Sequence, residues 1–553
     1  MARWRLLEPE AGVVSKLKRM AGVETLCARV LANRGVDPEA ASGFLSPSLK
    51  TIGAPKEEAW YVAARRVAQA VKNGERIGIF GDYDADGITS AAVLFLALFR
   101  YTKELTVKLP TRQTGYSLLE PYVRDLFAEG VDLLITADCG ISNKVEVALA
   151  NSLGMDVVVT DHHIPPEEPP DTAVAVLDPK LWDPEDPLAG VGVAWKLAWA
   201  VAKELQDPDG KRHIGRLLDL VSIGTIVDIA PLVGDNRALA STGLKYMNRS
   251  LYAGSVRPGI EALVKVAGVR GYLDEEDLGW KLGPRLNSIG RIKNPQPALE
   301  LLLTEDRSEA LRIASLLNQM NYDRQQRTRY AVERALGEVD PKEDFKVVVS
   351  EETGGLAGLV AGKVAGAMGR PAAVLDRRVD GSYSGSARSG ETDVDLYGAL
   401  FEVRHLLGGW GGHRKAAGLS ITPGNFDGFV AGVNRAVRAQ LKKNPELFSP
   451  PIEIDAEVSL ENLSDELLCW HESLSPFGSG NYRPVFVTEG VRVEGARRLW
   501  EGMNLLELEG GVSAKLAGPE EAVPTEAFDA AYTVYRSAYT REVELEIIDW
   551  KTS

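Results

Sequence analysis

Short apolar segments alternate with helical segments between residues 77 and 177, and this alternation constrains the fold more than any other feature of the chain. The strand-like segments are 77–81 (IGIFG), 105–110, 131–138, 156–161 and 173–177. The helical segments are 88–100, 118–129 and 143–153. Nearly continuous apolar strands separated by helices indicate a parallel sheet covered by helices. In such a sheet, ligands bind at the carboxyl ends of the strands.

The 553-residue chain is long enough for three or four domains at about 150 residues each. Residues 188–335 have a mainly helical pattern and end in a long polar helix suited to connect two domains. A second α/β pattern begins at Phe345 and includes a Gly-rich helix over 356–368. The C-terminal region alternates as strands do, which predicts a small β-barrel. The predicted domains are 1–60, 61–335, 336–445 and 446–553.

The formal net charge of −15 argues against a protein that coats nucleic acid through bulk charge. A nucleic-acid substrate remains compatible with it, because Lys281 to Arg334 contains ten Lys and Arg against six Asp and Glu. The sequence has no apolar stretch long enough for a transmembrane helix and no apolar region of a secretion signal near its N-terminus. Its three cysteines match no zinc-binding pattern. We therefore expect a cytoplasmic protein that does not associate with membranes.

Polar side chains cluster where the strand-like segments end, and one acidic residue interrupts a later apolar segment. These side chains belong to Asp82, Asp84, Asp86, Asp138, Asp161, His162, His163 and Asp228. Carboxylates gathered at one edge of a sheet would repel one another strongly without a cation among them. A set of carboxylates and imidazoles suits Mn²⁺, Mg²⁺ or Zn²⁺, and this set is large enough for two ions about 3.5–4 Å apart.

Each cluster also has an ordinary structural explanation. An isolated Asp-x-Asp is usually a turn, and a His-His pair after a strand is more often structural than ligating. Cys139, beside Asp138, is most simply a small buried residue. The coincidence of the clusters at successive strand ends of one α/β unit favours the metal site.

Four motifs, DYDADG, DCG, DHH and GTIVDIAPL, occur in this order and resemble those of the DHH phosphoesterase superfamily. Six further segments resemble the RecJ family of bacterial single-strand-specific exonucleases: ANRGVDPEAASGFLSPSL, PTRQTGYSL, KLGPRLNSIGR, GSARS, GGHRKAAG and SPFGSGN. The resemblance runs from about residue 4 to beyond residue 490. It implies a parallel-sheet DHH domain joined by a long helix to a smaller α/β DHHA1 domain, followed by a C-terminal β-barrel with the OB-fold.

The resemblance also implies roles for the clustered residues. Five of them would bind two Mn²⁺ ions, or Mg²⁺ in their place: Asp84, Asp86, Asp138, His162 and Asp228. Asp138 would bridge the two ions. Asp84 and Asp86 occupy alternate positions that point them apart, so we expect them to meet different ions. Asp82 would support the ligands. Asp161 would orient the histidines, and His163 would face the scissile phosphate.

Contacts to the 5′ end of a substrate follow from the same resemblance. Ser386 and Arg388 would hold the 5′ phosphate together with Arg112, because an Arg fork suits bidentate phosphate binding. Gly412 and His413 of the GGH motif would close over the nucleotide. Considered without the family, that motif is more simply a tight turn.

Contacts along the strand are also implied. Arg285, Asn287 and Arg291 would contact the backbone near the cut. The OB-like barrel would follow the single strand with aromatic and basic side chains. Its candidates are Tyr482, Arg483, Phe486, Arg497, Arg498 and Trp500. A core position explains Phe486 at least as well, and GNYRP at 480–484 departs from the GNPxP of the family.

These implications together predict a metal-dependent 5′→3′ exonuclease that degrades single-stranded DNA to 5′-mononucleotides in DNA recombination and repair. It would act as a monomer, with single-strand-binding protein and a helicase as partners. Some relatives carry a further C-terminal domain after the barrel, and binding of partners can depend on that domain. Two alternatives are a phosphodiesterase for short oligonucleotides or cyclic dinucleotides and a non-catalytic DNA-binding scaffold. The additional N-terminal segment and barrel argue against the first alternative, and retention of the expected ligand positions argues against the second.

Overall fold

The computed structural model describes residues 3–53, 55–111, 117–292, 294–350, 353, 355–500, 502–537 and 542–552. The chain divides into two compact units, and each is described by itself. The first unit comprises Ser42–Tyr322 and Ser473–Arg483. The second unit comprises Met1–Ala41, Asp323–Glu472 and Pro484–Ser553.

A five-stranded parallel sheet forms the centre of the first unit, as the alternating pattern predicts. Its strands are β2 (Ile77–Gly81), β3 (Leu105–Lys108), β4 (Leu133–Ala137), β5 (Asp156–Thr160) and β6 (Ala175–Leu177). Their order is β3-β2-β4-β5-β6 and every pairing is parallel. The carboxyl ends of β2, β4 and β5 therefore meet at one edge, where the acidic clusters follow them.

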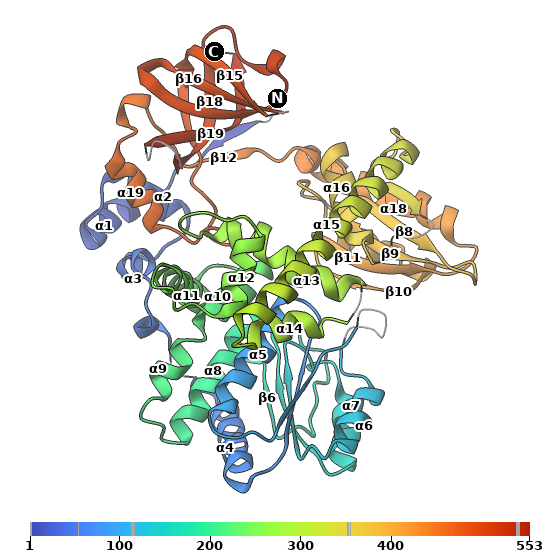
Figure 1. The fold of residues 1–553 in the computed structure, drawn as a ribbon. Helices are drawn as coiled ribbons and strands as arrows, with labels where there is room; N and C mark the ends of the chain where they lie inside the picture. The colour runs from blue at the N-terminus through green and yellow to red at the C-terminus, as the bar shows by residue number, and fades with distance from the viewer. Residues whose placement is uncertain are drawn as a thin grey trace. The chain divides into compact units, whose positions relative to one another are not determined.

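Helices cover both faces of this sheet (Figure 1). α4 (Glu58–Asn73), α5 (Ala85–Phe99) and α8 (Gly190–Glu204) bury their apolar residues against one face, together with Ile77 and Ile79 of β2. α6 (Glu120–Ala128) and α7 (Lys144–Ser152) cover the other face, against which Phe80 packs. Successive side chains of a strand point to opposite faces, so a strand covered on both sides must be apolar throughout.

The rest of the first unit is helical. Its helices are α9 (Gly210–Gly215), α10 (Leu218–Val227), α11 (Gly234–Tyr252), α12 (Pro258–Val266), the π-helix η3 (Asp277–Leu282), α13 (Gly283–Ile292), α14 (Gln296–Leu303) and the first half of α15 (Arg307–Glu338), with α3 (Ala41–Leu45) at its start. α10 is apolar on nearly every side because it packs against α5, α8 and α11. The predicted connector helix begins earlier than its polar stretch suggests, since Ile313 and Leu317 are buried in the core.

Residues 473–483 differ from the predicted domain boundaries, because they pack within the first unit and not with the C-terminal strands. The buried Arg237 of α11 donates hydrogen bonds to the carbonyl oxygens of Ser473, Ser475 and Pro476 at 3.4–3.5 Å. Arg483, at the end of this segment, pairs with the buried Glu275 at 2.9 Å. Tyr482 and Arg483 are therefore not part of the C-terminal sheet, in contrast to the sequence-based expectation.

The second unit contains a mixed five-stranded sheet that corresponds to the second predicted α/β pattern. Its strands are β7 (Lys346–Ser350), β8 (Ala372–Arg377), β9 (Tyr383–Arg388), β10 (Leu407–Gly412) and β11 (Ala416–Ile421), in the order β10-β11-β9-β8-β7. Only the β7–β8 pairing of this sheet is parallel. The helices that pack on it are α16 (Ala357–Met368), α17 (Leu396–Glu402) and α18 (Phe426–Lys443).

The C-terminal strands form a seven-stranded sheet. They are β13 (Ala456–Glu457), β14 (Phe486–Val491), β15 (Val493–Trp500), β16 (Met503–Leu508), β17 (Val512–Ala517), β18 (Phe528–Arg536) and β19 (Val543–Thr552), in the order β13-β14-β18-β19-β17-β16-β15. Phe486 is fully buried, so its role is in the core. The exposed side chain of Trp500 lies on the edge strand β15.

The N-terminal residues join this C-terminal part of the chain and do not form a separate segment over 1–60. β1 (Trp4–Leu6) pairs in parallel with β12 (Ile452–Ile454), and Nε1 of Trp4 donates a hydrogen bond to Asp549 at 2.9 Å. Arg29 of α2 (Thr25–Asn33) donates to the carbonyl oxygen of Asp455. The helices α1 (Ala11–Ala21) and α19 (Asp465–Ser473) lie in the same part of the chain. None of the helices in the described ranges has the length and apolarity needed to cross a bilayer.

Candidate metal centre

Asp84 determines where α5 begins. Its Oδ1 accepts hydrogen bonds from the backbone N–H of Asp86 at 3.0 Å and of Gly87 at 3.1 Å, which is the geometry of a helix N-cap. The apolar pattern predicts that the helix starts at Ile88. With this cap the helix starts three residues earlier, at Ala85. As a consequence, Asp86 lies in the first turn of the helix.

Asp86 is fully buried against the beginning of α8. Its two carboxylate oxygens accept hydrogen bonds from the N–H groups of Gly190 at 2.9 Å and Val191 at 3.0 Å. Burial and, after it, the nearby charge of Asp84 raise the pKa of Asp86 to about 7, against the effect of these two hydrogen bonds. The helix N-terminus thus orients this carboxylate while its protein surroundings still disfavour its charge.

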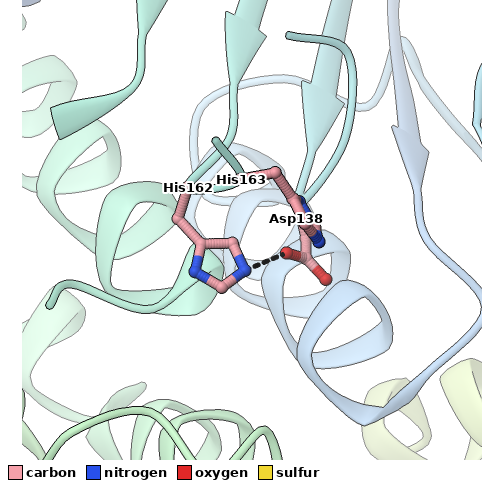
Figure 2. Close-up of side chains that lie close together, drawn as sticks. All are labelled: Asp138, His162 and His163. Carbon is pink, nitrogen blue, oxygen red and sulfur yellow. Dashed lines mark ion pairs between the residues drawn. The ribbon is translucent and has the colours of Figure 1, made fainter. Parts of the chain in front are cut away.

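Asp138 follows β4 in an unusual backbone conformation. Its φ of 63° lies in the left-handed region, which non-glycine residues seldom adopt. Its Oδ1 lies 3.0 Å from Nε2 of His162, and the imidazole ring points toward the carboxylate (Figure 2). Backbone strain of this kind is concentrated at functional sites.

Asp161 holds the two histidines that follow it. Its Oδ1 accepts hydrogen bonds from the backbone N–H of His162 at 2.7 Å and of His163 at 3.2 Å, and lies 2.8 Å from Nδ1 of His163. Its Oδ2 accepts from the N–H of Ile141 at 2.9 Å. Burial raises the pKa of Asp161, but the hydrogen bond and charge of His163 outweigh burial and bring the pKa below its ordinary value.

Asp228 joins the cluster from the end of α10. Its Oδ2 lies 3.9 Å from Nε2 of His162, the same distance that separates that nitrogen from Oδ2 of Asp86. The next residue, Ile229, has a φ of 61°, which is a rare conformation for a β-branched side chain. The backbone therefore changes direction immediately after Asp228.

The side chains form overlapping groups with the geometry of cation ligands. One ligand atom from each of Asp82, Asp84 and Asp138 lies within 4.8 Å of the others, and the same holds for Asp86, His162 and Asp228. A third group contains Asp138, His162 and His163. Asp84 and Asp86 thus fall into different groups. Asp82 is itself in a group of potential ligands, whereas the sequence predicts that it only supports the ligands.

The electrostatics of these groups fit divalent cations. Burial, followed by repulsion from neighbouring carboxylates, raises the pKa values of Asp82, Asp138 and Asp228 well above their ordinary range. Burial and the charge of His163 lower the pKa of His162 to about 3, so its ring is neutral and can ligate. Oδ1 of Asp82 and Oδ1 of Asp138 are buried and accept no hydrogen bond from the described residues. These oxygens and the neutral imidazole nitrogen are a donor set that suits Mn²⁺ or Mg²⁺.

Glycines allow the acidic loop to pack this closely, and the sequence interpretation did not include most of them. A Cβ at Gly190 would lie 2.5 Å from Oδ1 of Asp138, and a Cβ at Gly224 would lie 2.8 Å from Oδ1 of Asp86. Gly87 is equally restricted, because its Cβ would lie 2.5 Å from the backbone nitrogen of Asp82. The only sequence signal for Gly190 is the GVG at the beginning of an apolar helix.

Asn236 is a further supporting residue that sequence patterns did not indicate. It is fully buried at the start of α11. Its Oδ1 accepts a hydrogen bond from the N–H of Ala189, and its Nδ2 donates to the carbonyl oxygens of Pro187 and Pro231. It therefore ties the segment before α8 to the segment that follows Asp228.

The structure gives two of the predicted strand-contacting residues local roles. Oδ1 of Asn287 accepts a hydrogen bond from the N–H of Ala85 at 2.7 Å, so this side chain also positions the start of α5. Arg285 donates to Oδ1 of Asn318 and to the carbonyl oxygen of Lys281. Arg112 and the side chain of Arg291 lie outside the described residues.

The predicted 5′-phosphate residues belong to the second unit, around β9. Ser386 and Arg388 lie two residues apart on this strand, beside the first turn of α16. A Cβ at Gly358 would lie 2.5 Å from a guanidinium nitrogen of Arg388 and 3.5 Å from Oγ of Ser386. Gly412 ends β10 with a φ of 141°, and the N–H of the exposed His413 bonds to the carbonyl oxygen of Ala416. The GGH motif therefore ends strand β10 and begins the turn to β11.

Three family models match successive parts of the chain. The DHH family, N-terminal domain, matches residues 76–225, which contain the metal centre except Asp228. The DHHA1 domain matches residues 344–439, and the RecJ OB domain matches residues 454–548. The order of these models agrees with the order of domains that the sequence predicts.

Curated relatives decide the family. The single-stranded-DNA-specific exonuclease RecJ of Salmonella typhimurium is 32% identical over 506 residues, which cover 86% of this chain and 84% of that protein. The chain belongs to the RecJ family. The Bacillus subtilis relative of the same name is 35% identical over 509 residues, which cover 90% of this chain. The match spans 63% of that relative, so the chain corresponds to less than two thirds of its length.

A solved RecJ structure has the same fold. The crystal structure of RecJ in complex with Mn²⁺ from Thermus thermophilus matches this chain with a TM-score of 0.85 and 28% identity. The match covers 100% of this chain and 80% of that chain. The α/β fold with DHH, DHHA1 and OB parts is thus confirmed.

Proposed function

We propose that the chain is a divalent-metal-dependent exonuclease that hydrolyses single-stranded DNA from its 5′ end to 5′-mononucleotides, in DNA recombination and repair. The observation that carries this proposal is the pair of ligand groups that meet at Asp138 and His162. The names of the RecJ relatives support the substrate, and the Thermus thermophilus structure with Mn²⁺ supports the cofactor.

Two ions fit the ligand groups better than one. The first would be held by Asp82, Asp84 and Asp138, which makes Asp82 a ligand and not only a support. The second would be held by Asp86, His162 and Asp228, with Asp138 shared between the ions because its Oδ1 lies 3.0 Å from the ligating nitrogen of His162. Bound Mn²⁺ or Mg²⁺ would supply Lewis acidity, which lowers the pKa of water and offsets charge on a phosphate.

Other residues of the chain would position the strand. Asp161 fixes the ring of His163 through Nδ1, so that the second ring nitrogen can contact the scissile phosphate. Ser386, Arg388 and the start of α16 beside Gly358 would bind the terminal 5′ phosphate, and Gly412 and His413 would cover the nucleotide. Arg285, Asn287 and Arg291 would contact the strand backbone near the cut, and Arg112 would join Ser386 and Arg388 at the 5′ phosphate.

Strands labelled at either end test the proposal. Purified protein with Mn²⁺ should release label from 5′-labelled single-stranded DNA as mononucleotide, and should shorten a 3′-labelled strand progressively. EDTA should stop both the release of mononucleotide and the shortening of the 3′-labelled strand, because it removes the divalent ions. Release that begins at the 3′ end, or cleavage that is insensitive to EDTA, would contradict the proposal.

Asp138→Ala tests the shared ligand. We expect this variant to lose activity by at least about 10³-fold, because it removes a ligand from both ions. Its far-UV circular dichroism should match that of the wild type, and Asp125→Asn on the exposed surface of α6 is a matched control that should retain activity. Substantial cleavage by Asp138→Ala would show that the bridging role is wrong.

The same assays separate the two alternatives. A phosphodiesterase for small substrates would hydrolyse dinucleotides or cyclic dinucleotides faster than long DNA. A non-catalytic scaffold would bind no divalent ion in a calorimetric titration. The retention of every proposed ligand in one geometry favours the enzyme over the scaffold.

Three further properties are proposals that rest on the family alone. The protein would be a cytoplasmic monomer, and its partners would include single-strand-binding protein and a helicase. Light scattering after gel filtration tests the oligomeric state, and a dimer would contradict it. Co-purification with the two candidate partners tests their binding.

A further inference from the structure

A second cluster of basic and aromatic side chains lies on the C-terminal half of α11. Lys245, Asn248, Arg249 and Tyr252 share one face of this helix, because their spacings of three and four residues bring them together. With Tyr272 they line a depression of about 610 Å³ in the surface. We call these five residues the α11 groove.

Asn248 builds this groove by joining α11 to the segment after α12. Its Nδ2 donates hydrogen bonds to the carbonyl oxygens of Leu244 and Leu273, and its Oδ1 accepts from the N–H of Leu273 at 2.8 Å. The side chain is 7% exposed, so these bonds are shielded from water. Tyr272 is therefore held beside Arg249 and Tyr252 by a buried amide.

The groove is positive although the whole chain carries a formal net charge of −15. In the part of the chain that the structure describes, no ion pair joins Lys245 or Arg249 to a carboxylate. Burial lowers the pKa of Lys245, and the neighbouring charges of Arg237 and Arg249 lower it further. Two cations on one helix face without an acidic partner favour an anionic ligand.

The aromatic residues indicate the kind of anion. Tyr252 is 98% exposed and Tyr272 is 67% exposed, so both rings are accessible to a ligand in the same depression. A free phosphate would need only the cations. Aromatic rings beside basic side chains match the way proteins bind single-stranded nucleic acid, through base stacking and phosphate contacts.

We propose that the α11 groove is a second contact surface for single-stranded DNA, separate from the metal centre, in which Tyr252 and Tyr272 stack on bases and Lys245 and Arg249 bind phosphates. This inference rests on the proposed nuclease function. Lys245 lies eleven residues after the start of α11 at Gly234, which is about 17 Å along the helix at 1.5 Å per residue. We therefore expect the groove to bind nucleotides other than the one that is cut.

Binding of a fluorescent strand of about 30 nucleotides, longer than one single-strand site, tests this inference by anisotropy in EDTA. We expect Tyr252→Ala to raise Kd about tenfold, as the loss of base stacking does elsewhere. Arg249→Glu should raise Kd more, and should reduce the slope of log K against log salt by about 0.7 for each lost phosphate contact. Both side chains face solvent or line the groove, so circular dichroism should be unchanged.

Arg212→Glu is the matched control, because Arg212 is an exposed arginine on α9, in the same unit, and the substitution changes the net charge equally. If Arg249→Glu weakens binding no more than Arg212→Glu, the groove is not a DNA contact. The inference is also overturned if Tyr252→Ala binds the long strand as the wild type does.

Short strands separate the groove from the metal centre. Tyr252→Ala should hydrolyse a 5′-phosphorylated strand of about four nucleotides at the wild-type rate, because a strand this short fills at most one single-strand site and is cut only at the metal centre. Equal losses on short and long strands would mean a structural defect and would overturn the inference. Wild-type protein that binds the long strand through the groove in EDTA but does not degrade it with Mn²⁺ would contradict the proposed function alone.

Discussion

Gly190 shows how a residue without a functional group can shape a candidate metal centre. Its N–H donates a hydrogen bond to Asp86, and a Cβ at this position would lie 2.5 Å from Oδ1 and 2.9 Å from Cγ of Asp138. Even alanine would therefore displace the whole carboxylate that we propose to bridge two ions. The backbone of Gly190 is helical, so the requirement comes from space and not from conformation.

Gly190→Ala should lower the affinity for Mn²⁺ by about 10- to 100-fold, the usual effect of disturbing the residues that orient a ligand. Calorimetric titration with Mn²⁺ measures this affinity. Gly215→Ala on α9 is the control, because a Cβ there has no neighbour within 4 Å. Equal Mn²⁺ affinity in the two variants would refute the steric argument.

At the scale of residues, the sequence indicated which polar side chains the structure brings together, but not the residues that hold them in place. The carboxylates and histidines could be found because several of them follow apolar strands and form recognisable motifs. Gly190 and Asn236 could not be found, because their roles depend on α8 and α11 packing beside the acidic loop. A glycine or asparagine far away in the sequence carries no local sign of such contacts.

At the scale of elements, the strands of the parallel sheet were predictable and the helix starts were less so. All five strand-like segments contain strands, because each is apolar and bounded by polar residues. The start of α5 was misplaced by three residues, since apolar periodicity does not record the capping by Asp84. The carboxylate of Asp84 thus caps α5 and is also a potential ligand of the candidate metal centre.

Asn434 of α18 offers a test of how an element of the second unit is held. Its Oδ1 accepts hydrogen bonds from the N–H groups of Asp344 and Phe345, and its Nδ2 donates to the carbonyl oxygens of Phe345 and Val430. Asn434→Ala leaves buried backbone groups without partners at the start of β7. We expect a loss of about 3 kcal/mol in the free energy of unfolding, measured by urea denaturation.

The exposed neighbour Arg435 provides the control for this experiment. Arg435→Ala should change the free energy of unfolding by less than about 0.5 kcal/mol, as surface substitutions usually do. If Asn434→Ala were no more destabilising than Arg435→Ala, the buried amide would not be what fixes β7 to α18.

At the scale of the whole molecule, long-range pairing explains where the predicted domain boundaries and the structure diverge. β1 pairs with β12, more than 400 residues later, and this places the N-terminal residues in the second unit. Residues 473–483 return to the first unit through the buried Arg237. Local patterns of apolarity indicate where an element lies along the chain but not which distant element it joins.

The stability of the whole chain should depend on divalent metal, because several carboxylates, among them the buried Asp82, Asp86 and Asp138, lie together. Burial and mutual repulsion raise the pKa of Asp86 to about 7 and those of Asp82, Asp138 and Asp228 well above their ordinary range. When the pKa of a carboxylate is higher in the folded chain than in the unfolded chain, the group favours the folded state fully at pH values below its unfolded pKa. This contribution to stability is lost as the pH rises through the pKa of the folded state. Without metal, the protein should therefore become less stable between about pH 5 and pH 8.

Thermal unfolding in EDTA and in Mn²⁺ at several pH values measures this dependence. At a concentration of 100 times Kd, Mn²⁺ should add about 2.7 kcal/mol, or several degrees in Tm, and the gain should be larger at pH 8 than at pH 5.5 because the ions replace protons on the carboxylates. Asp138→Asn removes one repelling charge, so it should raise Tm in EDTA at pH 8 while reducing the gain from Mn²⁺. A gain from Mn²⁺ that is independent of pH, or equal in Asp138→Asn, would show that the ions bind somewhere other than this cluster.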